Sequence, residues 1–354
     1  MKKNFQTIKE VVKDNWLYIT FMTIFIFASF YPVNYFIIIG GGISNIGNRV
    51  EVKDAYEEKG SLNISYVTEL DGTLLTYGLS YLIPSWETQE ISKYTYTSNE
   101  SIKEIEFRDN LDLDVSSSNA IYYAYTLANK PIELTSTKYY VYATFEGYDT
   151  NLKVGDQLIE INGKKLEQDF KFKEEIDKFN VGDTIKIKLI RNNKEEVIDA
   201  PIFKSNKDGS KIIGIYLQSL NEYKTDPKVN IEFAKDEAGP SGGLITALSI
   251  YNKLTKKDIT HGLTIAGTGT MEADGSIGPI GGVEYKLKGA SKKADIFLVP
   301  EGENYEEAKA IKQKKGYKIK IIPVSSLEDA IEKLNELEKD DKYDLNPKSW
   351  TVYK

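Results

Sequence analysis

The first part of the chain carries one long apolar segment. No charged residue occurs between Asp14 and Arg49, and residues 16–39 read WLYITFMTIFIFASFYPVNYFIII. About 20 apolar residues are enough for a helix to cross a bilayer. The pattern therefore predicts a transmembrane helix over 16–39, after a short N-terminus over 1–15, with Pro32 ending or kinking the helix. A buried core helix is the alternative, although such a helix is rarely apolar on all sides.

The charges beside this segment predict its orientation. Four lysines precede it: Lys2, Lys3, Lys9 and Lys13. After it, Arg49 and Lys53 are interleaved with acidic residues. Because an excess of positive charge stays on the cytoplasmic side, we expect a single-pass protein of the cell membrane. Its N-terminus would be cytoplasmic and its catalytic part extracytoplasmic.

The remaining pattern changes three times along the chain. Short alternating runs such as LNISYVTEL predict strands, and helical runs alternate with strands toward the C-terminus, as in DIFLVP followed by NYEEAKAIKQKKG. This predicts an α/β mixed (α+β) fold. The expected parts are a β-rich membrane-proximal segment (50–115), a second domain (116–203), a third domain (204–340) and a tail (341–354).

Composition narrows the chemistry. The 354 residues carry a net charge of −7, and the pI of about 5.2 argues against nucleic-acid binding. There is no cysteine and a single histidine, His261, which excludes thiolate and multi-histidine metal sites as well as a cysteine nucleophile. The sequence contains no P-loop motif. We therefore predict neither a metal nor a cofactor.

A glycine-rich turn presents the first candidate for catalysis. Ser241 lies in A-G-P-S-G-G, immediately before the helical run LITALSIYNKL. Backbone N–H groups at a helix start favour negative charge and can stabilise an oxyanion. Ser241 is thus a candidate nucleophile, with the backbone at Gly239 and Gly242 as candidate oxyanion donors. The alternative is that Ser241 is an ordinary helix N-cap.

A lysine in a later helix presents the second candidate. The predicted apolar stripe of that helix consists of Val283, Leu287, Ala290 and Ala294. Lys286 lies three positions after the first of these and therefore points with the stripe toward the interior. Desolvation lowers the pKa of a lysine, which suits a general base. The alternative is a lysine whose amine reaches solvent from the helix start.

A serine nucleophile requires a base, and two are available. A Ser-Lys dyad of Ser241 and Lys286 is a recognised arrangement. The competitor is His261, because G-P-S-G-G formally matches the G-x-S-x-G nucleophile elbow. However, His261 follows the serine by only 20 positions and lies in a turn-like segment. An ester hydrolase that uses Ser241 and His261 stays open as an alternative.

The segment 239–300 resembles the Lon proteolytic domain. G-P-S-G-G is similar to that family's G-P-S-A-G, and P-I-G-G-V-E-Y-K is similar to its P-I-G-G-x-x-x-K. The resemblance implies that Ser241 is the nucleophile and Lys286 the general base. It also implies that Thr268, within A-G-T-G-T-x-x-x-D-G, supports the lysine through its hydroxyl.

One position departs from this family pattern. The acidic residue that often precedes G-P-S is Ala238 here, with Asp236 and Glu237 close by. The sequence leaves the role of these two carboxylates open.

A second resemblance precedes the first. The passage L-K-V-G-D-Q-L-I-E-I-N-G-K is similar to a PDZ domain, a family that accepts an extended peptide along a sheet edge. The resemblance implies an edge strand over 139–144, with Tyr140 and Val141 as peptide contacts. The carboxylate-binding loop would lie around 136–138.

The order of these parts resembles the bacterial membrane-anchored PDZ-Lon proteases. This implies an ATP-independent serine endopeptidase that acts on loosely folded or membrane-proximal proteins. Self-association into a hexamer is also implied by the resemblance. The alternative is a non-catalytic membrane adaptor, in which the PDZ part binds partners and the Lon-like part is a scaffold.

Overall fold

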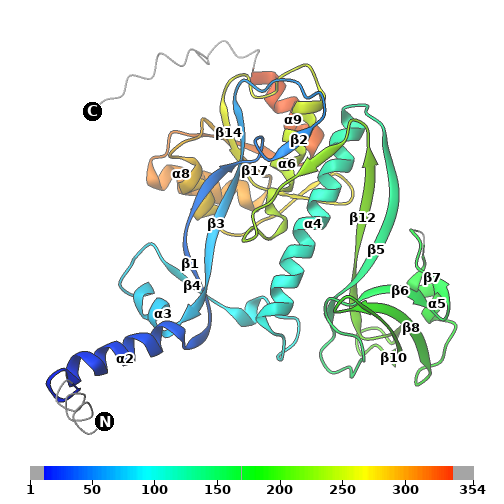
Figure 1. Cartoon of the computed structure of the whole chain (residues 1–354). Coiled ribbons are helices and arrows are strands. Elements are labelled where there is room, and N and C mark those ends of the chain that lie inside the picture. The colour runs from blue at the N-terminus through cyan, green and yellow to red at the C-terminus, as the bar shows by residue number, and fades with distance from the viewer. Residues whose placement is uncertain (1–11, 169, 338–354) are drawn as a thin grey trace, which may run out of the picture. The chain divides into compact units, whose positions relative to one another are not determined.

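A computed structural model describes residues 12–168 and 170–337, which form two compact units (Figure 1). The first unit contains the chain up to Gly40 and the segment Val67–Thr95. The second contains Gly41–Tyr66 and the chain from Tyr96 onward. Two long strands, β1 (Pro32–Asn45) and β3 (Ser61–Thr73), have residues in both units. Most of the predicted N-terminus, three of its lysines and the predicted tail 341–354 lie outside the described residues.

The apolar segment of the first unit divides into a helix and a strand. Helix α2 spans Trp16–Phe30, and β1 begins at Pro32. The predicted continuous helix over 16–39 is therefore wrong. The residue before a proline is pushed out of the helical region, and Tyr31 is accordingly extended, with φ −76° and ψ 112°. No side chain of α2 is buried. Among the described residues, no helix has both the length and the apolar character needed to cross a membrane.

Short elements complete the first unit. Strand β4 (Glu87–Glu90) pairs antiparallel with β1. Helix α3 (Leu74–Ser80) begins after Thr73, whose side chain and backbone form a reciprocal capping box with Thr76. A 3₁₀ turn, η1 (Ile91–Lys93), follows β4. The Leu74 N–H donates to the Tyr31 carbonyl over 3.0 Å, which ties the start of α3 to the end of α2.

The second unit is built on a mainly parallel sheet. Its strands follow the order β18-β17-β14-β3-β1, in which β14 (Thr264–Gly267) is parallel to both β3 and β17 (Ile296–Pro300). Strand β18 (Lys320–Val324) is parallel to β17. The strand predicted from DIFLVP is therefore β17. All five of its residues are buried, as expected for an interior strand of a parallel sheet covered on both faces.

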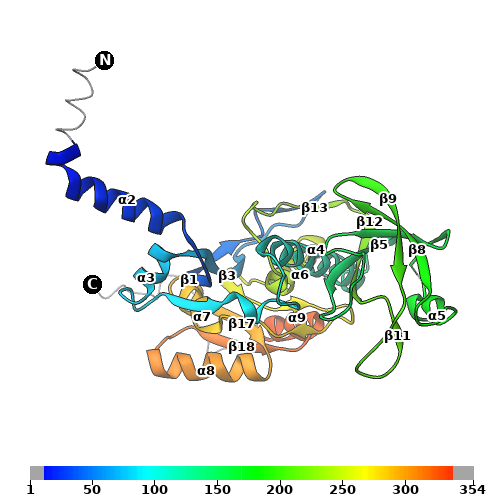
Figure 2. The same ribbon diagram turned by 90° about the horizontal axis from the view of Figure 1, so that it is seen from below.

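Helices cover both faces of this sheet (Figure 2). Along β17, Ile296 and Leu298 face one core and Phe297 and Val299 face another, because successive side chains of a strand point to opposite faces. The first core is covered by α4 (Ile102–Leu127), α6 (Gly243–Leu254) and α9 (Leu327–Glu336). The second is covered by α7 (Val283–Ala290) and α8 (Glu303–Lys315). The predicted mixed α/β fold is confirmed.

Helix α4 crosses the predicted domain boundary between positions 115 and 116. It begins after Ser101, which forms a capping box with Glu104, and it runs through position 116. It packs against α6, which covers the first core. Strand β3 likewise comes from the segment 50–115 and pairs with β14. The predicted membrane-proximal segment thus supplies part of the central sheet and one covering helix.

A separate antiparallel sheet lies between α4 and α6 in the sequence. Its strands follow the order β12-β5-β6-β8-β9. Their bounds are Ile132–Thr144 for β5, Gln157–Ile161 for β6, Thr184–Arg191 for β8, Lys194–Pro201 for β9 and Ile215–Thr225 for β12. Strand β7 (Lys164–Lys165) pairs with β6, and α5 spans Phe172–Ile176. This sheet has its own core and includes β12, which follows the predicted boundary at 203.

Three two-stranded pairs of short strands accompany the two larger sheets. Strand β2 (Val50–Val52) pairs with β13 (Val229–Ile231), and β15 (Thr270–Met271) pairs with β16 (Ile277–Gly278). Strands β10 (Phe203–Lys204) and β11 (Lys211–Ile212) form a further pair. The 3₁₀ turn η2 (Pro240–Gly242) leads into α6.

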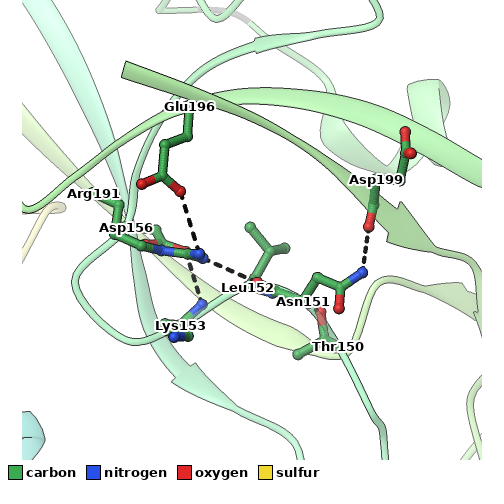
Figure 3. A network of polar contacts seen from close by, with 8 residues as sticks. All are labelled: Thr150, Asn151, Leu152, Lys153, Asp156, Arg191, Glu196 and Asp199. Carbon is green, nitrogen blue, oxygen red and sulfur yellow. Dashed lines mark hydrogen bonds and ion pairs between the residues drawn. The ribbon is translucent and has the colours of Figure 1, made fainter. Parts of the chain in front are cut away.

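A buried ion pair organises the loop before β6 (Figure 3). The Asp156 side chain is 1% exposed. It accepts hydrogen bonds from Arg191 Nε over 2.8 Å and from Arg191 Nη2 over 2.6 Å, and a third from the Lys153 N–H over 2.8 Å. Arg191 Nη2 also donates to the Asn151 carbonyl over 3.0 Å. The guanidinium thus fastens the loop to the end of β8.

We expect Arg191→Leu to destabilise this sheet by about 3 kcal/mol, because removing one partner leaves a buried carboxylate uncompensated. Lys188→Leu, on the same strand, removes a solvent-exposed pair with Glu195 and should cost much less. Urea unfolding of both variants compares the two losses. Equal losses would contradict the assigned role of Arg191.

Candidate active site

Ser241 lies in a tight turn at the entrance to α6. It is the central residue of η2, and α6 begins two residues later at Gly243. The preceding Gly239 has φ 84°, a conformation that favours glycine. Ser241 itself is half-buried. The turn therefore places this serine where the sequence predicts it, at the start of a helix.

The backbone around Ser241 is held from two sides. Its carbonyl accepts hydrogen bonds from the Gly269 N–H over 2.8 Å and from the Thr268 hydroxyl over 3.2 Å. On the other side, the Asp109 carbonyl accepts from the Gly239 N–H over 2.9 Å, and Ser116 Oγ donates to the Pro240 carbonyl over 2.9 Å. The first pair of contacts comes from the segment after β14, and the second from α4.

Lys286 points into the protein. Its helix α7 begins after Gly282, which is left-handed with φ 69°. Lys286 is 5% exposed and lies on the same buried face as Val283 and Leu287, whereas Lys288 is exposed. The inward direction predicted from the helical spacing is confirmed.

Close backbone packing brings α7 to the sheet. A Cβ atom on Gly289 would lie 2.8 Å from Gly42 Cα, and one on Gly41 would lie 2.6 Å from the Tyr285 carbonyl oxygen. Such distances leave no room for a side chain at these positions. Helix α7 therefore packs directly against the β1 backbone.

Burial dominates the electrostatics of Lys286. Desolvation lowers the pKa of its amine from 10.5 to about 8, because a low-dielectric surrounding disfavours the charged form. Within residues 12–168 and 170–337, Lys286 has no ion-pair partner; its amine donates one side-chain hydrogen bond, to Thr268 Oγ1 over 3.2 Å. A substantial fraction of this amine is therefore neutral near pH 8.

Thr268 connects the two candidates. It is fully buried immediately after β14, accepts from Lys286 Nζ and donates to the Ser241 carbonyl. Ser241 comes from the first covered face of the sheet and Lys286 from the second, so the two meet at the carboxyl end of β14. In the described part of the chain, no hydrogen bond joins the Ser241 hydroxyl to the Lys286 amine.

Comparison with known families agrees with this geometry. Residues 224–336 match the family described as the Lon protease (S16) C-terminal proteolytic domain, and residues 147–202 match the PDZ domain family. The chain carries a PDZ domain and a Lon-type proteolytic domain. This confirms both resemblances seen in the sequence, and the combination is consistent with a PDZ-Lon protease.

Curated relatives that match part of the chain are Lon proteases. Over 99 residues the chain is 34% identical to the Lon protease of Aster yellows witches'-broom phytoplasma (strain AYWB), which covers 28% of this chain and 12% of that protein. Over 95 residues it is 35% identical to the Lon protease of Rickettsia bellii (strain RML369-C), covering 27% and 12%. The chain thus spans 12% of the length of these relatives.

Solved structures of PDZ domains are among those that resemble part of the chain. The PDZ domain of an SdrC-like protein from Listeria monocytogenes shares 29% identity, covering 23% of this chain and 88% of that one, with a TM-score of 0.21. That of an SdrC-like protein from Listeria innocua shares 32% identity, covering 23% and 92%, also with a TM-score of 0.21.

The structure bears differently on the backbone N–H groups of Gly239 and Gly242, the two predicted oxyanion donors. The Gly239 N–H already donates to Asp109, so the prediction that it faces an oxyanion is wrong for this conformation. Gly242 is buried, and a Cβ atom placed on it would lie 2.9 Å from Ile64 Cδ1. Glycine at this position therefore allows β3 to pack onto the turn.

The competing base is not placed beside the serine. His261 Nε2 lies 3.2 Å from the Leu334 carbonyl of α9, and no hydrogen bond in the described structure joins His261 to Ser241. Of the two open carboxylates, Asp236 is exposed, whereas Glu237 forms an ion pair with Arg49 at 2.5 Å. In the same described residues, no cluster of His, Asp and Glu side chains could hold a metal ion.

The predicted peptide-binding edge of the PDZ domain is wrong. Strand β5 pairs along its length with β12, and Tyr140 also pairs with Gln157 of β6. On that second side, the Val141 N–H donates to the Asp156 carbonyl over 2.9 Å. The expected carboxylate loop at 136–138 is part of β5. Tyr140 and Val141 thus lie on an interior strand, and β12 is the adjacent edge of the sheet.

Sequence reasoning missed the contribution of α4. Asp109 and Ser116 contact the Gly239-Pro240 turn across more than 120 sequence positions. No motif marks these residues. The available signal was a run of three serines, 116–118, inside a helical stretch, where serine is a weak helix former.

We expect Lys286→Met to raise the free energy of unfolding. The folded pKa of Lys286 lies below its unfolded value, so the folded state disfavours the protonated amine. This penalty is fully present below pH 8, falls between pH 8 and 10.5, and is absent above. It corresponds to about 3 kcal/mol at most. Denaturant unfolding at pH 7 and pH 10.5 tests this, with the exposed Lys288→Met as control. A gain that does not depend on pH would contradict the assignment.

Proposed function

We propose that this protein is a serine endopeptidase that uses a Ser241-Lys286 dyad. The match to a Lon proteolytic domain supports proteolysis as the activity. One observation carries the assignment of the dyad: a buried lysine of lowered pKa shares a hydrogen-bonded threonine with the backbone of a serine in a tight helix-entrance turn. Burial alone makes such an amine partly neutral near pH 8, so the Ser-Lys pair needs no additional charged residue to lower its pKa.

In the proposed mechanism, Ser241 Oγ attacks the carbonyl carbon of the scissile peptide bond. The neutral Lys286 amine takes the proton from the hydroxyl as the new C–O bond forms. The resulting ammonium gives that proton to the nitrogen of the leaving amine as the C–N bond breaks, which leaves an acyl-enzyme. Lys286 then takes a proton from water, whose oxygen attacks the ester, and returns a proton to Ser241.

Thr268 orients the lysine in this scheme. By accepting one N–H of Lys286, its hydroxyl fixes the direction of the amine and favours a lone pair that faces Ser241. The mechanism requires the Ser241 hydroxyl to reach this amine when substrate binds, and catalytic hydrogen bonds are often formed only with substrate bound. We assign the oxyanion to backbone N–H groups of the Ser241 turn, including Gly242, and not to Gly239.

The substrates we propose are loosely folded or membrane-proximal proteins, cleaved without ATP. Support comes from the absence of a P-loop motif in the sequence, because stable substrates would need an unfolding motor. The PDZ domain would present or gate these substrates. Assembly into a hexamer is proposed from the resemblance to Lon-type domains alone.

We also propose that the protein is attached to the cell membrane through its N-terminal apolar segment, with the catalytic domain extracytoplasmic. The apolar side chains of α2 support this attachment: none of them is buried, and Phe21, Ile24 and Phe27 are more than half exposed. Large exposed apolar surfaces mark contacts with lipid or with other proteins. Helix α2 alone is about 22 Å long.

Labelling with a serine-reactive phosphonate tests the dyad. We expect the wild type to be labelled and Ser241→Ala not to be. Lys286→Arg should slow labelling by about a hundredfold or more, because arginine stays protonated and general-base catalysis is worth that much. In the wild type, the rate should rise about tenfold per pH unit below pH 8 and level off above it, since the neutral amine is the active form.

The controls separate the alternatives. His261→Ala should label at the wild-type rate, and its loss of labelling would favour a Ser-His hydrolase instead. If the wild type is not labelled at any of the pH values tested, the non-catalytic adaptor is favoured.

Membrane attachment predicts a different outcome. After alkaline carbonate extraction of host cell membranes, we expect the wild type to stay in the pellet. The double variant Phe21→Lys, Ile24→Lys should move to the soluble fraction, because each charge in an apolar phase costs about 3 kcal/mol. Val197→Lys, an equally exposed apolar position in the PDZ domain, is the matched control. Identical distributions of both variants would contradict attachment through α2.

A further inference from the structure

Three consecutive serines of α4 donate hydrogen bonds to three different backbone carbonyls. Successive residues of a helix are rotated by about 100°. Accordingly, Ser116 Oγ donates to the Pro240 carbonyl over 2.9 Å, and Ser117 Oγ donates to the Leu113 carbonyl of its own helix over 2.6 Å. Ser118 Oγ donates to the Asn221 carbonyl of β12, also over 2.6 Å. Only the first of the three reaches the turn that carries Ser241.

Ser116 joins that turn to a second strand. Its oxygen also accepts a hydrogen bond from the Met271 N–H of β15 over 3.0 Å. The side chain is 3% exposed, so both contacts are made away from solvent. The single hydroxyl thus links the residue before Ser241 to the strand that follows Thr268.

The space around this hydroxyl is tightly filled. A Cβ atom on Gly243, at the start of α6, would lie only 2.1 Å from Ser116 Oγ. Glycine at this position therefore lets α4 come close enough to make the contact. Two turns earlier on the same face of α4, the Asp109 carbonyl holds the Gly239 N–H. Helix α4 thus forms hydrogen bonds with the turn at two successive residues, 239 and 240.

We propose that Ser116 is a positioning residue for Ser241. This inference rests on the proposed Ser-Lys mechanism. The Ser241 carbonyl is fixed by Thr268 and Gly269, and Ser116 fixes the peptide unit on the other side of the same residue. With both peptide units held, the serine side chain starts from a defined point relative to Lys286. Ser116 belongs to α4, outside the residues 224–336 that match the Lon family.

The expected effect is on the chemical step. In Ser116→Ala, the Pro240 carbonyl and the Met271 N–H lose their shared partner, and the turn can shift. A displacement of about 1 Å at a reacting group can cost about a hundredfold in rate. Because Ser116 is buried, we expect kcat for a peptide substrate to fall tenfold to a hundredfold with KM nearly unchanged. Ser116 does not contact Lys286, so the pH midpoint of the rate should stay at its wild-type value.

The test measures the rate and the final stoichiometry of phosphonate labelling on the full chain. A positioning role predicts that Ser116→Ala reaches the wild-type stoichiometry at a rate reduced tenfold or more. Ser118→Ala is the matched control, since it also removes a buried hydroxyl of α4 and one bond to a backbone carbonyl. It should label at the wild-type rate, as should Ser117→Ala.

Each other outcome overturns the inference. A lower stoichiometry at an unchanged rate means that Ser116 only supports folding. An equal fall in rate for Ser116→Ala and Ser118→Ala means that any loosening of α4 has this effect. If the wild type is not labelled at Ser241, the proposed function itself fails; if the wild type is labelled and Ser116→Ala matches its rate, only the present inference fails.

Discussion

The burial of a lysine amine is the constraint on which the proposed catalysis depends. Lys286 is 5% exposed and lies on the inner face of α7, a helix that comes directly against the β1 backbone where Gly289 meets Gly42. With no acidic partner in the described structure, the amine is not stabilised as a cation, and its pKa falls to about 8. Burial of Lys286 therefore costs stability and leaves an amine that is partly neutral near pH 8. This supports the proposal of Ser241 as a nucleophile that needs no histidine.

The architecture explains how two helices from opposite faces serve one site. Ser241 enters from the face covered by α6 and Lys286 from the face covered by α7, and they meet beyond the carboxyl end of β14 at Thr268. Ligand sites of open α/β sheets commonly lie at such strand ends. The site also depends on residues that precede the PDZ domain, since β3 lies beside β14 and α4 holds the turn before Ser241. The PDZ domain is thus an insertion within the proteolytic unit.

Sequence patterns predicted the parts of this site that local rules determine. Helical spacing placed Lys286 on the inner face of α7, and proline and glycine placed Ser241 in a turn. Long-range pairing could not be predicted in the same way. The run 16–39 contains no charged residue that would mark a boundary, yet the structure divides it at Pro32 into a helix and a strand. Strand β5 reads as an edge until β12 pairs with it, and the paired residues are 71 to 93 positions apart in the sequence. The contacts of α4 with the Ser241 turn left only one local signal, the run of three serines 116–118, and it does not name the partner of these residues.

The central claim is most directly tested by titrating the Lys286 amine itself. In protein labelled with ¹³C at lysine Cε, the resonance missing from Lys286→Arg identifies this residue, and its chemical shift can be followed from pH 6 to pH 11. Burial of the amine predicts a midpoint near pH 8. A midpoint near 10.5, the ordinary value for lysine, would contradict the proposed role of Lys286.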